Sequence, residues 1–208
     1  MAERLVERFG VTPLALDDLL LTTLRELAQE QRAPWQALLK ADAAFAASGS
    51  IGAGLASYAR LALERVVARV AELAAAAGPR TVLLAHRAGL VARYWEVGGR
   101  ELLVALQNAA GRPADAPHGL WLLVPMEDPE ASPALDGRTV DVVDRATGWV
   151  VLDGLFLKEL KSGTWEKTGV AVGSACRGRG LSRHTATLLV MGMVRGVEIV
   201  SVPTLPYI

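Results

Sequence analysis

Cysteine is nearly absent from this sequence, because Cys176 is the single cysteine among 208 residues. One cysteine cannot form an intrachain disulfide, and zinc sites built on pairs of cysteines are excluded with it. Small secreted domains usually depend on several disulfides, whereas proteins of the cytoplasm keep their thiols reduced. We therefore expect a cytoplasmic protein.

The sequence also lacks an excess of either charge, with 22 lysines and arginines against 22 aspartates and glutamates. Proteins that grip the phosphates of nucleic acids usually show a basic excess or a basic stripe. The overall composition therefore disfavours nucleic-acid binding and leaves room only for a local basic patch. A neutral chain has little long-range repulsion, which favours docking onto other proteins or onto a second copy of itself.

Long apolar runs are missing as well. A transmembrane helix needs about 18 or more consecutive apolar residues. The apolar segment Leu61–Ala77 is interrupted by charged residues, and the first eight residues contain acids and no apolar core. We expect neither a membrane span nor a secretory signal.

The common catalytic signatures do not occur. There is no Gly-x-x-x-x-Gly-Lys phosphate loop, no His-Arg-Asp or Asp-Phe-Gly kinase motif and no Gly-x-Ser-x-Gly elbow. The three histidines are scattered, without a pair at metal-ligand spacing. His86 follows an apolar run, where a catalytic base can lie, but a structural histidine is the interpretation that we favour. We assign no catalytic residue and expect no cofactor.

Two short apolar runs, Val82–Ala85 and Leu120–Val124, flank a helix-like stretch in the middle of the chain. This order predicts a strand, a crossover helix and a second strand parallel to the first. Near-continuous apolar strands are typical of parallel sheets that are covered on both faces. The sequence therefore predicts an α/β fold.

The first third of the chain has helical periodicity. Leucines recur at steps of three and four residues between Leu16 and Leu27, and Thr12-Pro13 has the residue types of a helix start. Two further helices are expected at 34–47 and 55–77, the last ending at Gly78-Pro79.

These patterns divide the chain into three parts. An N-terminal helical segment of about three helices (residues 1–78) is expected to pack on a small, mainly parallel α/β layer (residues 79–161). The layer also contains an expected hairpin of 139–143 with 149–152. Residues 162–208 form an irregular C-terminal tail in this scheme, with 188–194 as a possible strand. The tail either is loosely attached or does not belong to the ancestral domain.

Four carboxylates follow expected strands and are candidate ligands for Mg²⁺, which prefers oxygen ligands. They are Glu127, Asp128, Asp144 and Asp153. The alternative, which we favour, is that they are turn residues, since Asp-Pro and Asp-Gly pairs are typical of turns. A magnesium-dependent phosphoester hydrolase is the enzyme hypothesis that this set supports.

Arginines are concentrated in the C-terminal tail. They are Arg177, Arg179, Arg183 and Arg195. A cluster of this kind can contact phosphates, so weak nucleic-acid binding through the tail is a third hypothesis.

Several segments resemble the C-terminal region of large multidomain proteins of Pgl/BREX-type phage-resistance systems, in particular the component that carries kinase or ATPase activity. They are Phe9-Gly-Val-Thr-Pro13, Trp35-Gln-Ala-Leu-Leu-Lys-Ala-Asp-Ala43, Thr81-Val-Leu-Leu-Ala-His-Arg-Ala-Gly-Leu-Val-Ala-Arg-Tyr94, His118-Gly-Leu-Trp-Leu-Leu-Val-Pro-Met-Glu-Asp-Pro129 and Leu135-Asp-Gly-Arg-Thr-Val140. None of these segments is a catalytic signature. The resemblance implies a part in phage defence within a larger assembly of proteins. The leading hypothesis is a non-catalytic accessory module that binds other protein components.

Overall fold

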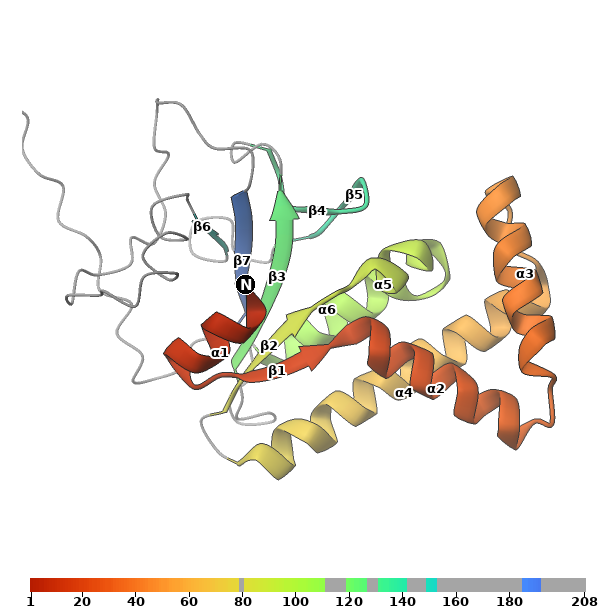
Figure 1. Ribbon diagram of the computed structural model, residues 1–208, viewed down its shortest axis with the longest axis horizontal. Helices are drawn as coiled ribbons and strands as arrows, with labels where there is room; N and C mark the ends of the chain where they lie inside the picture. Colours follow the sequence, from red (N-terminus) through yellow and green to blue (C-terminus); the bar gives the residue numbers. More distant parts are fainter. Residues whose placement is uncertain (79–80, 111–118, 127–130, 142–148, 153–184, 192–208) are drawn as a thin grey trace, which may run out of the picture.

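The computed structural model describes residues 1–78, 81–110, 119–126, 131–141, 149–152 and 185–191. These residues form a sheet with helices on both faces (Figure 1). The helices are α1 (Ala2–Phe9), α2 (Leu16–Glu30), α3 (Trp35–Ser48), α4 (Ala53–Ala77), α5 (Gly89–Arg93), the short 3-10 helix η1 (Trp95–Val97) and α6 (Gly99–Ala110). The strands are β1 (Thr12–Ala15), β2 (Val82–His86), β3 (Gly119–Met126), β4 (Ala134–Leu135), β5 (Arg138–Thr139), β6 (Trp149–Leu152) and β7 (Thr185–Met191).

The main sheet has the strand order β1-β2-β3-β7-β6. Strands β1, β2 and β3 are parallel, and the expected strand–helix–strand unit is confirmed because Val82 pairs with Gly119 and Ala85 with Leu122. Helices α5, η1 and α6 lie in the connection between β2 and β3. Strand β7 is antiparallel to β3, and β6 is antiparallel to β7. The α/β fold class is therefore confirmed, with a parallel part of three strands.

The helices expected at 34–47 and 55–77 correspond to α3 and α4. The expected start of the first long helix at Thr12-Pro13 is wrong, because these residues belong to β1 and α2 begins at Leu16. Strand β1 is the edge of the described sheet. An edge strand tolerates proline, since one side of its backbone bonds to no neighbouring strand.

The expected hairpin of 139–143 with 149–152 lies partly outside the described residues and stays a prediction. Among the described residues, Leu135 pairs with Arg138 in a two-residue hairpin of β4 with β5, and β6 pairs with β7. The hairpin loop is Asp136-Gly137, and both residues have positive φ angles, 46° and 79°. This Asp-Gly pair favours the tight turn that joins two antiparallel strands. In the tail, the strand expected at 188–194 overlaps β7, so the tail contributes a strand to the sheet.

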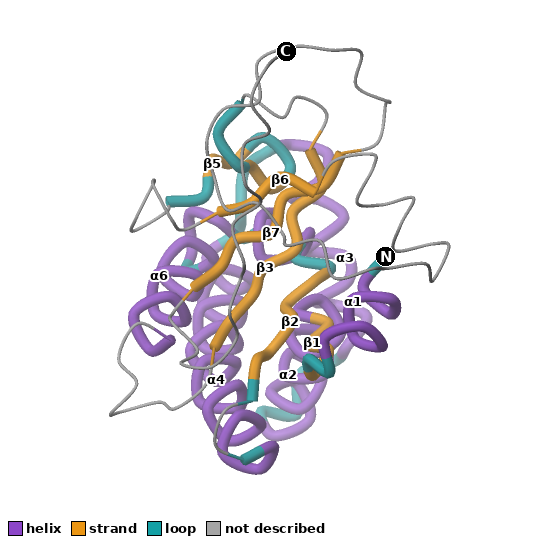
Figure 2. The backbone as a smooth tube through the Cα atoms, turned by 90° about the vertical axis from the view of Figure 1, so that its left-hand side faces the viewer, coloured by secondary structure: helices purple, strands orange, loops and turns teal. Residues whose placement is uncertain are grey.

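Helices lie on both faces of the sheet (Figure 2), and core residues pack on each face. Leu83 and Ala85 of β2 pack in one cluster with residues of α2, α4, α5 and α6, while Leu84 packs on the opposite face with Leu5 of α1. This alternation follows from the two-residue period of a strand. One sheet and one core thus join residues from the segments 1–78 and 79–161, and the proposed division of the chain stays a prediction.

Among the described helices, none combines the length and the apolar character that crossing a bilayer requires.

Candidate functional site

The site residues predicted from the sequence lie outside the residues that the structure describes. The candidate metal ligands are Glu127, Asp128, Asp144 and Asp153, and the candidate nucleic-acid contacts are Arg177, Arg179, Arg183 and Arg195. Both sets stay predictions. Within the described ranges, no group of three or more His, Cys, Asp or Glu residues could hold a metal ion.

The carboxyl end of β1 is joined to the carboxyl end of β2 through Asp17. Its backbone N–H donates to the carbonyl of Arg87 at 2.8 Å, and its Oδ1 accepts the N–H of Leu90 at 2.8 Å. The N–H groups in the first turn of a helix have no partner inside that helix, so Asp17 satisfies one of them in α5. Burial raises the pKa of the Asp17 carboxyl, while the hydrogen bonds from α5 act in the opposite direction.

A second carboxylate approaches the same place. Oδ2 of Asp17 and Oδ2 of Asp136 each lie 3.6 Å from the position that a Cβ on residue 89 would occupy, so the glycine at this position keeps space open beside both. Asp136 reaches this position from the tip of the β4–β5 hairpin. The start of α2 and the tip of the β4–β5 hairpin thus both lie beside the start of α5.

His86 and Arg87 follow at the same edge. Burial lowers the pKa of the His86 imidazole, and the positive charge of Arg87 lowers it further. The imidazole is therefore neutral at pH 7. Arg87 has a positive φ of 54° and its Nη1 lies 2.9 Å from Oδ2 of Asp18, in an exposed ion pair. Through this ion pair, Arg87 links the end of β2 to α2.

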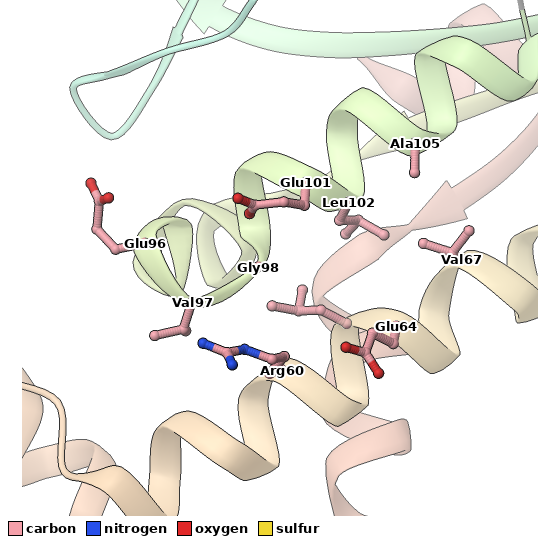
Figure 3. A pocket seen from close by; sticks show the side chains of 10 residues that line it. Arg60, Glu64, Val67, Glu96, Val97, Gly98, Glu101, Leu102 and Ala105 are labelled. Atoms are coloured by element: carbon pink, nitrogen blue, oxygen red, sulfur yellow. The ribbon is translucent and has the colours of Figure 1, made fainter.

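A second site lies on the far side of α4 from α2, where an open groove of about 370 Å³ runs between α4 and α6 (Figure 3). Its apolar lining comes from Leu63, Val67, Val97, Leu102 and Ala105, and its charged lining from Arg60, Glu64, Glu96 and Glu101. Leu63 and Leu102 are almost fully buried, whereas Val67 and Ala105 are half-buried and accessible from the groove. An apolar floor with a few charged groups at its edges is the usual lining of a binding site.

Two glycines allow the start of α6 to pack closely, Gly98 against α4 and Gly99 against α5. Gly98 has a φ of 134°, and a Cβ at this position would lie 3.2 Å from Cδ1 of Leu63. A Cβ on Gly99 would lie 2.2 Å from the carbonyl oxygen of Val91. The chain can therefore turn from η1 into α6 only where side chains are absent. The sequence patterns do not reveal the groove, because its two walls are distant in the sequence.

The comparisons with known proteins give one relevant match. No family model matches the chain, and no solved structure matches it. The chain is 34% identical over 166 residues to a protein of Streptomyces coelicolor described as "Probable kinase PglW". The match covers 77% of this chain and 10% of that protein, so the chain spans about a tenth of the length of this curated relative. The resemblance to part of a Pgl-type protein, expected from the sequence segments, is thereby confirmed.

Proposed function

We propose that this chain is a non-catalytic protein-interaction module of a phage-defence system and acts within a larger assembly of proteins. The observation that carries this proposal is the similarity to a portion of a Pgl-type kinase component over 77% of the chain. Pgl/BREX-type systems act against phage, and this chain matches a portion of one of their large components. We also propose that it works in the cytoplasm, where such components meet phage.

The contacts at the strand ends support an interaction module over an enzyme. Asp17 accepts the N–H of Leu90, and Arg87 pairs with Asp18. These polar groups hold α2, α5 and the end of β2 together. A catalytic acid or nucleophile needs access to a substrate, which a helix-capping carboxylate does not readily have. The α4–α6 groove, in contrast, is open and free for contact with another molecule.

Phage challenge tests the proposed role in defence. In the bacterium that encodes the chain, deletion of its gene is expected to raise the plating efficiency of phage, and re-expression is expected to restore resistance. Ala105→Glu places a charged side chain in the groove with only a small loss of helix propensity. It is expected to restore resistance poorly, whereas Ala71→Glu, on an exposed position of α4 outside the groove, restores it fully.

Co-purification and an activity assay test the molecular role. The tagged chain is expected to retain other components of the defence system, and Ala105→Glu is expected to lose them. The purified chain is expected to hydrolyse bis-(p-nitrophenyl) phosphate no faster with Mg²⁺ than with EDTA. Magnesium-dependent turnover, or full resistance to phage after deletion of the gene, would contradict the proposal.

A further inference from the structure

We propose that the α4–α6 groove binds a segment of a partner protein in which a lysine or arginine lies beside aliphatic side chains. This inference rests on the proposed interaction function and specifies the chemistry of its partner. Three properties of the groove carry it: its apolar floor, the placement of its carboxylates, and its shape.

The floor selects aliphatic side chains. Val67 of α4 and Ala105 of α6 are half-buried on the two walls of the groove (Figure 3). The buried Leu63 and Leu102 also belong to its apolar lining. Covering the remaining apolar surface with an aliphatic side chain removes it from water, which is worth about 25 cal/mol per Å². The side chains of Val67 and Ala105 carry no polar group. A polar residue of the partner would therefore lose its hydrogen bonds to water there and gain none from these side chains.

The walls select a positive charge. Glu64 of α4 and Glu101 of α6 both belong to the lining, one on each wall of the groove (Figure 3), and both are exposed. Neither forms an ion pair with another described residue, whereas Glu96 is already paired with Arg138 at 3.1 Å. Arg60 is the one cationic residue in the lining and extends toward Val97 at the end of the groove. The lining therefore holds more negative than positive charge, and a cationic side chain of a partner gains a favourable interaction with these carboxylates.

The shape favours a protein segment over a small molecule. The groove is open along the line where α4 and α6 pack, and it is not an enclosed cavity. Grooves between packed helices commonly bind an amphipathic segment whose anchors recur at helical spacing. A small cation would interact with the carboxylates and leave the apolar floor exposed to water.

The test uses two synthetic peptides with leucines at identical helical positions, one with lysines and one with glutamates at the remaining positions. Binding of each labelled peptide to the full chain is measured by fluorescence anisotropy at low and at high salt. The lysine peptide is expected to bind more tightly, and the double variant Glu64→Gln/Glu101→Gln is expected to weaken it by about fivefold. Glu72→Gln, an exposed position of α4 outside the groove, is the matched control and should leave binding unchanged.

Several results would overturn the inference. Equal binding of the two peptides would show that the groove does not select charge, and unchanged binding by the double variant would place the peptide elsewhere. Spermidine that displaces the lysine peptide at equimolar concentration would point to a small cation. If the wild-type chain still retains defence components while these tests fail, the partner chemistry is wrong and the proposed function stands. Circular dichroism spectra of all variants exclude loss of folding as the cause.

Discussion

The hydroxyl of Tyr94 donates a hydrogen bond to Oδ1 of Asp42 at 2.7 Å, and this contact ties α3 to the connection between β2 and β3. Arg93 adds two contacts to the same residue, from Nε to Oδ1 at 2.7 Å and from Nη2 to the carbonyl at 2.8 Å. Helix α3 contains no fully buried residue and projects from the rest of the molecule (Figure 1). Asp42 therefore supplies the polar contacts that attach this helix, beside the apolar contacts of its partly buried residues.

Substitution of Tyr94 by phenylalanine removes one of these hydrogen bonds and keeps the stacked ring contact with Phe45, whose centroid lies 6.2 Å away. We expect the free energy of unfolding to fall by about 1 kcal/mol, the usual worth of a hydrogen bond to a partner in the protein. Asp42→Ala should cost about 2 kcal/mol, because the Tyr94 hydroxyl and Nε of Arg93 both lose the carboxylate that accepts their hydrogen bonds. Urea denaturation measures both changes.

Tyr58→Phe is the control for this experiment, because the Tyr58 hydroxyl makes no hydrogen bond to a described residue. It should leave stability nearly unchanged. Hydrogen exchange of the α3 amides provides a second measurement: exchange in α3 is expected to accelerate in Asp42→Ala before the amides of β2 and β3 are affected. Equal acceleration in the sheet would contradict the assignment of Asp42 to α3 attachment.

The same contact predicts a loss of stability at high pH. Burial raises the pKa of Tyr94 above its ordinary value of 10.0, and the hydrogen bond to Asp42 raises it further. In the unfolded chain this hydroxyl ionises near its ordinary value, whereas in the folded chain it stays protonated. The folded state therefore binds more protons above pH 10, and stability falls as the pH rises. Tyr94→Phe should show a shallower decline between pH 9 and 11 than the wild-type chain.

Much of the fold could be predicted from local patterns. The run Val82–Ala85 is apolar at every position, which indicates a strand covered on both faces, and its side chains do pack against α1 on one face and against the larger helices on the other. The leucine spacing of α2 and the glycine that ends α4 are likewise local signals. Each of these predictions needed only neighbouring residues.

What could not be predicted depends on residues far apart in the chain. Thr12-Pro13 is compatible with a helix start, and only the pairing of Pro13 with Leu84 makes it part of a strand. The α4–α6 groove requires the contact of Gly98 with Leu63, which no local pattern reports. The Asp136-Gly137 turn was a local signal, but its strands are two residues long, too short for an alternating pattern to be recognised.

The carboxyl of Asp17 predicts a second pH dependence of stability, which the variant Asp17→Asn tests. Burial raises its pKa above the ordinary value of 3.8, so the folded chain holds this proton more tightly than the unfolded chain. The contribution of Asp17 protonation to the free energy of unfolding is therefore largest below pH 3.8. This contribution is lost as the pH rises through the higher pKa of the folded state. Asp17→Asn keeps an oxygen that can accept the N–H of Leu90 and removes the titration.

Denaturation of both proteins between pH 3 and 7 checks this prediction. The difference in unfolding free energy, variant minus wild type, should become more favourable to Asp17→Asn as the pH rises. A difference that is constant over this range would show that the carboxyl has the same pKa in both states. Asp18→Asn is the control, since this neighbouring carboxylate is exposed and pairs with Arg87 at the surface.

The turn into α6 predicts a strong effect of a single methyl group. A Cβ on Gly99 would lie 2.2 Å from the carbonyl oxygen of Val91, and this oxygen belongs to the backbone and cannot rotate away. Gly99→Ala must therefore separate α6 from α5, at a cost of about 3 kcal/mol or more.

Gly54→Ala is the matched substitution in α4, where a Cβ would meet nothing within 4 Å. It should stabilise the chain by about 0.5 kcal/mol, because alanine loses less entropy in a helix than glycine does. Thermal unfolding measures both, and a Gly99→Ala protein as stable as the wild type would show that α6 does not depend on this close approach.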